Sequence, residues 1–266
     1  MLELSAMFRT RAAWWTAIAI LVVAARADAQ IVNVQGAIAK PPEQDGVTAQ
    51  IETKLDWREG NMSLIDVGAT ATVLVRHCRL LGLAIVRGEY GRSNDLTFKR
   101  KTFEHLRLRT TLGGWWRWEA FGQHELDTFR RLSVRALAGT GPAVQLLDRP
   151  HASVLAGAAY LLEYERLDRR MGARDAGARR FGHRASFYAT GSEPLSDAVS
   201  IVQTIYVQPR LDDLGDVRAL GEIAVTTKLS EHIALVDGFT VAYDRTPPDG
   251  VRRYDTQLRI ALLITF

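Results

Sequence analysis

The chain has 266 residues, of which 47% are hydrophobic, 24% charged and 8% aromatic, a composition that excludes an intrinsically disordered or collagen-like protein. Its formal net charge of +4 is spread along the chain, because 34 Lys and Arg residues are interleaved with 30 Asp and Glu residues. A nucleic-acid-binding protein usually concentrates its positive charge on one face, so we expect no nucleic-acid partner.

The N-terminal residues predict an export signal. Arg9 and Arg11 precede an apolar run from Ala12 to Ala25, and small residues follow as far as Ala29. This is the three-part pattern of a secretory signal peptide, with cleavage expected before Gln30. The run has about 14 residues, whereas a membrane-spanning helix needs about 20, so an uncleaved anchor is the less favoured alternative. We therefore predict a signal peptide at 1–29, followed by a short periplasmic segment at 30–46.

An alternation of apolar and polar residues then begins and continues to the C-terminus. From Leu258 to Phe266, for example, every second residue is a large apolar one. Successive side chains of a β-strand point to opposite faces, so this pattern predicts strands with one apolar surface. About twelve such segments occur, near 47–57, 62–76, 79–90, 102–113, 115–124, 131–146, 152–166, 181–190, 198–209, 215–228, 231–244 and 252–266.

The lengths of these segments and of their connections predict the fold class. Strands of a soluble sandwich have about 5–6 residues, whereas tilted strands that cross a bilayer need about 9–11. Short connections, near 77–78, 113–114, 147–151, 191–197 and 229–230, alternate with longer or more charged ones, near 91–101, 123–130, 167–180, 210–214 and 245–251. This alternation is typical of outer-membrane proteins with short periplasmic turns and long outer loops. We predict an all-β, transmembrane, antiparallel up-and-down barrel of about 12 strands over 47–266, located in the outer membrane.

The lone cysteine, Cys78, falls within the first of the short connections. It cannot form an intramolecular disulfide, and it does not follow the expected cleavage site, where a lipoprotein anchor would need it. His77 beside it offers a second soft ligand, but zinc sites use four ligands in recurring spacings. A turn is the favoured interpretation, and we expect no metal and no cofactor.

The inner face of the predicted barrel carries charges of both signs. Glu52, Lys54, Asp56 and Arg58 alternate along one strand, and Arg107 and Arg109 share a face of another. Opposite charges can bridge the lumen of a mid-sized barrel and narrow it. The sequence therefore favours a structural protein or a narrow or gated pore over an open channel.

Aromatic residues near the predicted strand ends are expected to form girdles at the lipid headgroups. A carbohydrate-stacking site is the alternative. The aromatic residues concerned are Trp57, Tyr90, Trp115, Trp116, Trp118, Tyr164, Tyr243 and Tyr254.

The densest basic region is predicted to be an outer loop. Arginine pairs bidentately with phosphates, and such a loop would face lipopolysaccharide. We predict possible phosphate contacts for Arg169, Arg170, Arg174, Arg179 and Arg180, with a merely solvated loop as the alternative.

An enzyme is the alternative class of function. Outer-membrane deacylases and phospholipases place Ser and His on a barrel, and Ser186 lies three positions after His183. No Gly-x-Ser-x-Gly motif is present, so we expect no catalytic residues and no enzyme.

Two strands depart from the alternation. Asp237 falls on the apolar face that carries Leu235 and Phe239, and the strand around Gln203 has no clean polar side. A β-bulge that shifts the phase locally is the expected explanation.

Several stretches resemble the outer-membrane family catalogued as domain of unknown function 481, whose members are often labelled YdiY-like or salt-induced outer-membrane proteins. They are Phe121–Phe129, Arg135–Gly141, Ala156–Tyr160 with Glu163 and Glu165, and Tyr243–Gly250 with the terminal Phe266. The resemblance covers the mature chain and implies a β-barrel of unknown activity linked to envelope stress. It brings no catalytic residues to carry over.

Phe266 ends the last predicted strand on its apolar face. A terminal aromatic residue resembles the signal that the barrel assembly machinery recognises, so we expect that machinery and outer-membrane lipid as partners.

Overall fold

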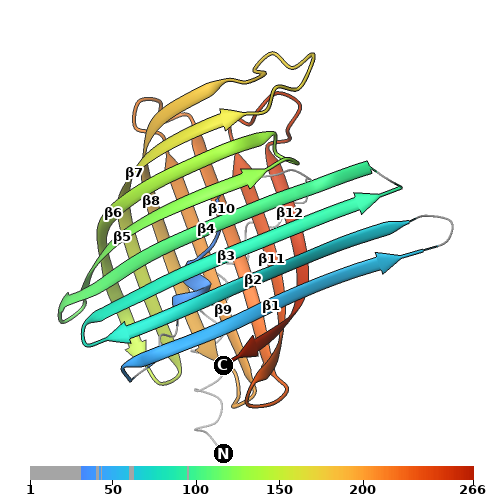
Figure 1. Cartoon of the computed structure of the whole chain (residues 1–266). Helices are drawn as coiled ribbons and strands as arrows, with labels where there is room; N and C mark the ends of the chain where they lie inside the picture. The colour runs from blue at the N-terminus through green and yellow to red at the C-terminus, as the bar shows by residue number, and fades with distance from the viewer. Residues whose placement is uncertain (1–30, 40–41, 43, 60–62, 95) are drawn as a thin grey trace, which may run out of the picture.

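The twelve predicted strands are all present and close into one barrel (Figure 1). The computed structural model describes residues 31–39, 42, 44–59, 63–94 and 96–266; the predicted signal peptide lies outside the described residues. Each strand pairs antiparallel with its sequence neighbours, and β1 pairs with β12 to close the barrel. The strands are β1 Gly46–Arg58, β2 Leu64–His77, β3 Leu80–Ser93, β4 Leu96–Gly113, β5 Trp116–Asp127, β6 Leu132–Arg149, β7 Ala152–Leu167, β8 Arg179–Pro194, β9 Val199–Pro209, β10 Val217–Lys228, β11 Ile233–Asp244 and β12 Tyr254–Thr265. The predicted fold class is therefore confirmed.

The two ends of the barrel differ in their connections. At the end where β1 begins and β12 ends, which we name the turn end, the connections are short and occupy 78–79, 114–115, 150–151, 195–198 and 229–232. At the opposite, loop end, the connections at 168–178, 210–216 and 245–253 are the longest.

The prediction of longer connections at 91–101 and 123–130 is wrong, because the connections observed there are only 94–95 and 128–131. β3 continues to Ser93 and β4 begins at Leu96, with Asn94 at φ 44° in the turn between them. Asn tolerates this left-handed conformation better than most residues. The charged residues that suggested a loop are strand residues: Lys99, for example, pairs with Asp66 and Glu89 at 2.8 and 3.1 Å. The local charge thus reflects a polar barrel interior.

Inner and outer faces of the wall alternate as predicted. On β4, Leu106 and Leu108 are exposed on the outside, whereas His105, Arg107 and Arg109 are buried inside. The same alternation on β1 exposes Leu55 and Trp57 outward. The outer surface is therefore apolar and the inner surface polar.

Asp237 lies on the outer face, which corrects the expected β-bulge. The register of β11 is continuous on both sides, with Asp237 opposite Val225 on β10 and Ile260 on β12. The phase therefore does not shift, and the carboxylate stays among apolar neighbours. The register is likewise continuous through Gln203 on β9.

The interior of the barrel is filled in part by residues 31–39, which precede β1. Ile31 packs with Tyr188, Tyr206 and other wall residues, and Val34 and Ile38 pack with a second cluster that includes Phe103. Residues 35–38 of this segment form a 3₁₀ helix. No helix in the described part of the chain has the length and apolar character needed to cross a membrane. Part of the predicted periplasmic segment 30–46 thus lies inside the barrel.

Close approach of β6, β7 and β8 explains two of the glycines in this part of the wall. A Cβ at Gly141 would lie 2.0 Å from the carbonyl oxygen of Ala158, and one at Gly157 would lie 2.3 Å from the ring of Tyr188. Neither position can hold a side chain without moving its neighbours. The absence of a side chain at Gly157 therefore leaves room for the ring of Tyr188, which is buried inside the lumen.

Candidate functional site in the barrel lumen

The N-terminal segment, which we define as residues 31–39, is anchored to the lumen wall by polar contacts. The amide of Asn33 donates to Glu222 on β10 at 3.0 Å, and the side-chain oxygen of Gln35 accepts from Arg109 on β4 at 2.6 Å. Gln35 is fully buried. These contacts reach opposite parts of the wall, so the segment crosses the lumen.

Glu119 on β5 forms the centre of one buried charge cluster. It accepts hydrogen bonds from Arg107 and Arg109, each at 2.6 Å, and from the hydroxyl of Tyr188 at 2.9 Å. The guanidinium of Arg107 also lies 4.3 Å from the ring centre of Phe121. Because the partners come from β4, β5 and β8, the cluster ties separate parts of the wall together across the interior.

Glu163 on β7 forms the centre of a second buried cluster, which joins β6, β7, β8 and β10. Its carboxylate binds Arg184 at 2.9 Å and Arg218 at 2.6 Å, and Arg135 lies 2.5 Å away. Arg218 also binds Glu165 at 2.9 Å. Buried charges require paired and hydrogen-bonded partners, and these groups provide them for one another.

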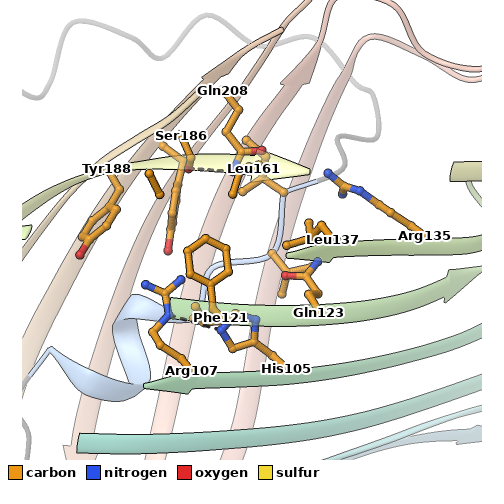
Figure 2. Close-up of a pocket in the computed structure, with 15 residues that line it drawn as sticks. His105, Arg107, Phe121, Gln123, Arg135, Leu137, Leu161, Ser186, Tyr188 and Gln208 are labelled. Atoms are coloured by element: carbon orange, nitrogen blue, oxygen red, sulfur yellow. Dashed lines mark hydrogen bonds between the residues drawn. The ribbon is translucent and has the colours of Figure 1, made fainter. Parts of the chain in front are cut away.

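The segment borders a small cavity and a larger one. The smaller, of about 30 Å³, lies between His105, Arg107, Phe121, Ser186, Tyr188 and Gln208 (Figure 2). It has room for about one water molecule. The larger, of about 310 Å³, is lined by Asn33 of the segment and by side chains of β1, β3, β4, β10 and β12.

The structure separates Ser186 and His183, the pair considered for hydrolysis. Ser186 is buried in the lumen, where its hydroxyl accepts from the amide of Gln208 at 3.0 Å. His183 lies on the outer face, in contact with Tyr160 and Phe181. A catalytic serine needs its base within hydrogen-bond distance, so these two residues do not form a nucleophile and base pair.

The predicted lumenal charges are placed inside only in part. Glu52 pairs with Arg259, and Lys54 lies 3.0 Å from Asp66, all within the barrel. Asp56 and Arg58 instead pair with each other at the exposed end of β1. Sequence reasoning did not identify Glu119, Glu163 and Arg218 as lumenal charges, although each lies on the polar phase of a predicted strand and Glu163 belongs to the stretches that resemble the family. The alternation of polar and apolar residues shows that such side chains face the lumen. It does not show which charges pair with one another, because that depends on the register between strands.

The predicted lipopolysaccharide contacts gather at the loop end. Arg169, Arg170, Arg174 and Arg179 are exposed, and Arg180 is half-buried. Arg174 is not free, because it binds Asp249 at 3.0 Å. Contact of these five residues with lipopolysaccharide phosphates stays a prediction.

A buried arginine holds the same loops together. Arg131 donates to Asp175 at 2.6 Å, to Asp168 at 3.0 Å and to the carbonyl oxygen of Asp249 at 2.7 Å. Burial raises the pKa of Asp175, but hydrogen bonds from the backbone N–H of Asp249 and from Arg131 outweigh it, so that this pKa falls below its ordinary value. The hydrogen bond from Arg174 lowers the pKa of Asp249.

At the turn end, Asp45 joins His77 and Cys78. The three exposed side chains bring one potential metal ligand atom each within 4.8 Å of one another. The carboxylate of Asp45 accepts from the backbone N–H of Cys78, which has φ 52°, at 2.9 Å. This hydrogen bond gives Asp45 a structural role, because its carboxylate stabilises the turn at Cys78. A turn is the interpretation favoured by the sequence.

Comparison with known proteins gives a family but no activity. The family described as "Protein of unknown function, DUF481" matches residues 51–266. No curated protein matches the chain.

Solved structures similar to this chain include three bacterial proteins. The translocator domain of the autotransporter NalP from Neisseria meningitidis is 14% identical, with 87% of this chain and 95% of that chain covered and a TM-score of 0.41. A bacterial polysaccharide outer membrane secretin is 10% identical, with 83% and 97% covered and a TM-score of 0.44. The NanC porin is 7% identical, with 83% and 98% covered and a TM-score of 0.43. At these scores the likenesses support no conclusion about function.

Proposed function

This chain belongs to the DUF481 family of proteins of unknown function, and from that premise we propose that it is an outer-membrane pore whose lumen is closed by its own N-terminal segment. The observation that carries the proposal is the position of residues 31–39 inside a closed barrel. The segment is held by hydrogen bonds to Glu222 and Arg109 and by apolar packing, and it is not a strand of the wall, so its departure from the lumen leaves the strand pairing of the wall intact. The pore is therefore narrow and gated.

Residence in a membrane is supported by the outer surface of the barrel. Leu55, Leu106 and Leu258 expose 71%, 67% and 73% of their surface, an unfavourable arrangement in water that lipid relieves. Aromatic residues lie near both ends: Trp115, Trp116 and Trp118 near the turn end, and Trp57, Tyr90, Tyr164 and Tyr254 near the loop end. We assign these residues to the two headgroup girdles.

Cell fractionation tests the membrane residence. The exported protein is expected in the outer-membrane fraction, and unboiled samples are expected to migrate differently from boiled samples on a denaturing gel. Recovery in the soluble periplasm, with identical migration of the two samples, would contradict it.

Closure of the lumen by the segment is supported by two kinds of contact. Apolar side chains of the segment pack against wall residues on both sides, and polar side chains bind the wall between them. The charge clusters around Glu119 and Glu163 fill further parts of the interior. Ions that crossed this lumen would have to displace the segment.

Planar-bilayer recording tests the gate. The wild type is expected to show rare, brief openings. A chain lacking residues 31–39 is expected to conduct steadily. The Asn33→Ala, Gln35→Ala double variant, which loses both of these side-chain hydrogen bonds to the wall but keeps the apolar packing, is expected to open more often than the wild type.

Gly36→Ala is the matched control for the gate. Gly36 is an exposed residue of the same segment, and the nearest atom to an added Cβ lies at 3.6 Å, an ordinary contact. This variant is expected to behave as wild type. Large, steady conductance of the wild type, or an unchanged trace after deletion of 31–39, would show that the segment is not a gate.

A further inference from the structure

The junction between β1 and β12 closes the barrel over only part of its height. Four residue pairs join these strands, from Gln50 opposite Thr265 to Thr53 opposite Leu262. Every other pair of neighbouring strands in the described residues is joined by eight to 14 pairs. Regular strand pairing is therefore shortest at this junction.

The gap lies in the half of the wall nearer the loop end. Figure 1 shows β1 and β12 meeting near the C-terminus and then running apart. Beyond the last pair, Lys54–Arg58 of β1 and Tyr254–Ala261 of β12 have no strand partner on the side that faces the gap. An unpaired strand edge is unfavourable in lipid, so a polar occupant of the gap is expected.

The larger cavity lies behind this gap. Glu52 and Lys54 of β1 line it on one side, and Gln257 and Arg259 of β12 line it on the other. Glu52 and Arg259 form an ion pair across the junction, at the point where regular pairing stops. Both edges of the gap thus contribute polar side chains to one cavity of about 310 Å³.

Two charged residues of the cavity form no direct ion pair among the described residues, although Arg87 lies close enough to Glu89 to interact with it electrostatically. Arg87 on β3 donates to the hydroxyl of Thr70 at 3.1 Å and lies 5.7 Å from the ring centre of Phe103. Glu222 on β10 accepts from the amide of Asn33 and from the hydroxyl of Thr240, at 3.0 and 3.3 Å. The cavity therefore offers one cation and one anion to a ligand.

The outer rim of the gap is apolar. Leu55 and Trp57 on β1 expose 71% and 69% of their surface, and Leu258 and Ile260 on β12 expose 73% and 60%. A molecule that occupied both the cavity and the gap would contact charged groups inside and apolar groups outside. This describes an amphiphile with a headgroup that carries both charges.

We propose that the cavity binds the headgroup of a zwitterionic glycerophospholipid, with its phosphate at Arg87 and its amine at Glu222. The polar glycerol ester groups of the lipid occupy the gap between the edges of β1 and β12, and the acyl chains extend from its apolar outer rim into the bilayer. Arginine favours phosphate and carboxylate favours ammonium, so the two side chains fix the orientation of the headgroup. This inference rests on the proposed membrane residence and on the seated position of the segment, since Asn33 lines the cavity and binds Glu222. Bound lipid and ion conductance are measured separately, so failure of the lipid site is distinguishable from failure of the gate.

A disulfide that seals the gap gives the first test. Residues 49 and 266 exchange backbone hydrogen bonds, so residues 58 and 257 would face each other as a non-hydrogen-bonded pair if this register continued, and a disulfide between them forms only when the two strands close the gap. Arg58→Cys with Gln257→Cys, in a Cys78→Ser background, is purified from membranes and examined by native mass spectrometry. Bound phospholipid is expected when the pair is reduced and is expected to be lost when the protein is oxidised in detergent.

The control disulfide lies in the part of the junction that is already paired. Gln50→Cys with Thr265→Cys joins two opposite residues of the existing register and leaves the gap open. This variant is expected to retain phospholipid in both redox states. Retention of lipid by the oxidised 58–257 protein, or a wild type that carries no phospholipid, would overturn the proposal, and bound lipopolysaccharide in its place would overturn the assignment to a glycerophospholipid.

Charge variants give a second test that needs no disulfide. In vesicles of equimolar phosphatidylethanolamine and phosphatidylglycerol, the wild type is expected to retain mainly phosphatidylethanolamine. Glu222→Gln is expected to lower that preference about tenfold, and Arg87→Gln to lower total bound lipid by a similar factor. Glu231→Gln and Arg79→Gln make the same changes in exposed turns and are expected to behave as wild type. Equal retention of the two lipids by the wild type would refute the zwitterionic headgroup.

Discussion

At the scale of single residues, Asp237 stands out because it places a carboxylate on the apolar outer face. Its neighbours in the register are Val225 and Ile260. Leu235 and Phe239 flank it on the same face of β11. A charged side chain on the lipid-facing surface of a barrel lowers the stability of the folded state. Asp237 therefore lowers the stability of the folded barrel, and no hydrogen bond or ion pair with another described residue compensates for this.

We predict that Asp237→Leu stabilises the barrel. The free energy of unfolding in lipid vesicles is expected to rise by about 1 kcal/mol, because an apolar side chain replaces a charge at this depth. Urea titration followed by tryptophan fluorescence measures the change. Asp197→Leu, in an exposed turn, is the control and should give no gain. A lower stability of Asp237→Leu would mean that the carboxylate has a partner.

At the scale of elements, β12 depends on its last residues for its junction with β1. The backbone N–H of Phe266 donates to the carbonyl oxygen of Ala49 at 2.9 Å, and its carbonyl oxygen accepts from Ala49 at 3.4 Å. The ring is 70% exposed on the outer face. With only four registered pairs beside them, these two hydrogen bonds are a large share of the junction.

Deletion of Phe266 is predicted to prevent closure of the barrel. The truncated chain loses both hydrogen bonds to Ala49, together with the terminal aromatic residue that we expect the assembly machinery to recognise. It should accumulate in the periplasm as protease-sensitive material, which fractionation with added protease detects.

Leu263→Ala, on the inner face opposite Glu52, is the comparison and should insert nearly as well as wild type. Normal insertion of the Phe266 deletion would show that the terminal residue is dispensable for assembly.

The sequence predicts the strands of this barrel far better than it predicts what fills the lumen. Alternation places all twelve strands, because the inner and outer surfaces differ in polarity along every strand. The same polarity makes residues 91–101 resemble a loop in the sequence, because inward charges such as Lys99 are also typical of loop residues. Two features of the barrel have no periodic pattern in the sequence that would predict them. They are the position of residues 31–39 and the short pairing of β1 with β12. Both depend on contacts between residues far apart in the chain, such as Asn33 with Glu222.

At the scale of the whole molecule, the loop end is held together by ion pairs. Arg131 connects the β5–β6, β7–β8 and β11–β12 loops through Asp168, Asp175 and the backbone of Asp249. Asp175 in turn accepts from the backbone N–H of Asp249 at 2.8 Å. One buried guanidinium therefore fixes three loops that are distant in sequence.

We predict that these loops separate in acid. The pKa values of Asp175 and Asp249 are lowered in the folded state, so their contribution to stability is present above the ordinary pKa. It is lost as the pH falls through the lowered values, which places the transition below about pH 4. A spin label at Met171→Cys, a 97% exposed position, in a Cys78→Ser background should become more mobile over that range.

Asp175→Asn tests the assignment of this transition. With the charge removed, the label should already be mobile at pH 6 and should change little on acidification. If the label in this variant is as immobile at pH 6 as the label in the parent protein, residues other than Asp175 hold the loops together.

The position of residues 31–39 also constrains the order in which the barrel is assembled. The segment precedes β1, yet it contacts Arg109 on β4 and Glu222 on β10, and the wall around it is completed only when β12 pairs with β1. A peptide enclosed by a wall must arrive before the wall closes or enter through an open end afterwards. If it arrives first, the segment acts as an internal template on which the strands collect, and the last hydrogen bonds to form, those of Phe266, enclose it.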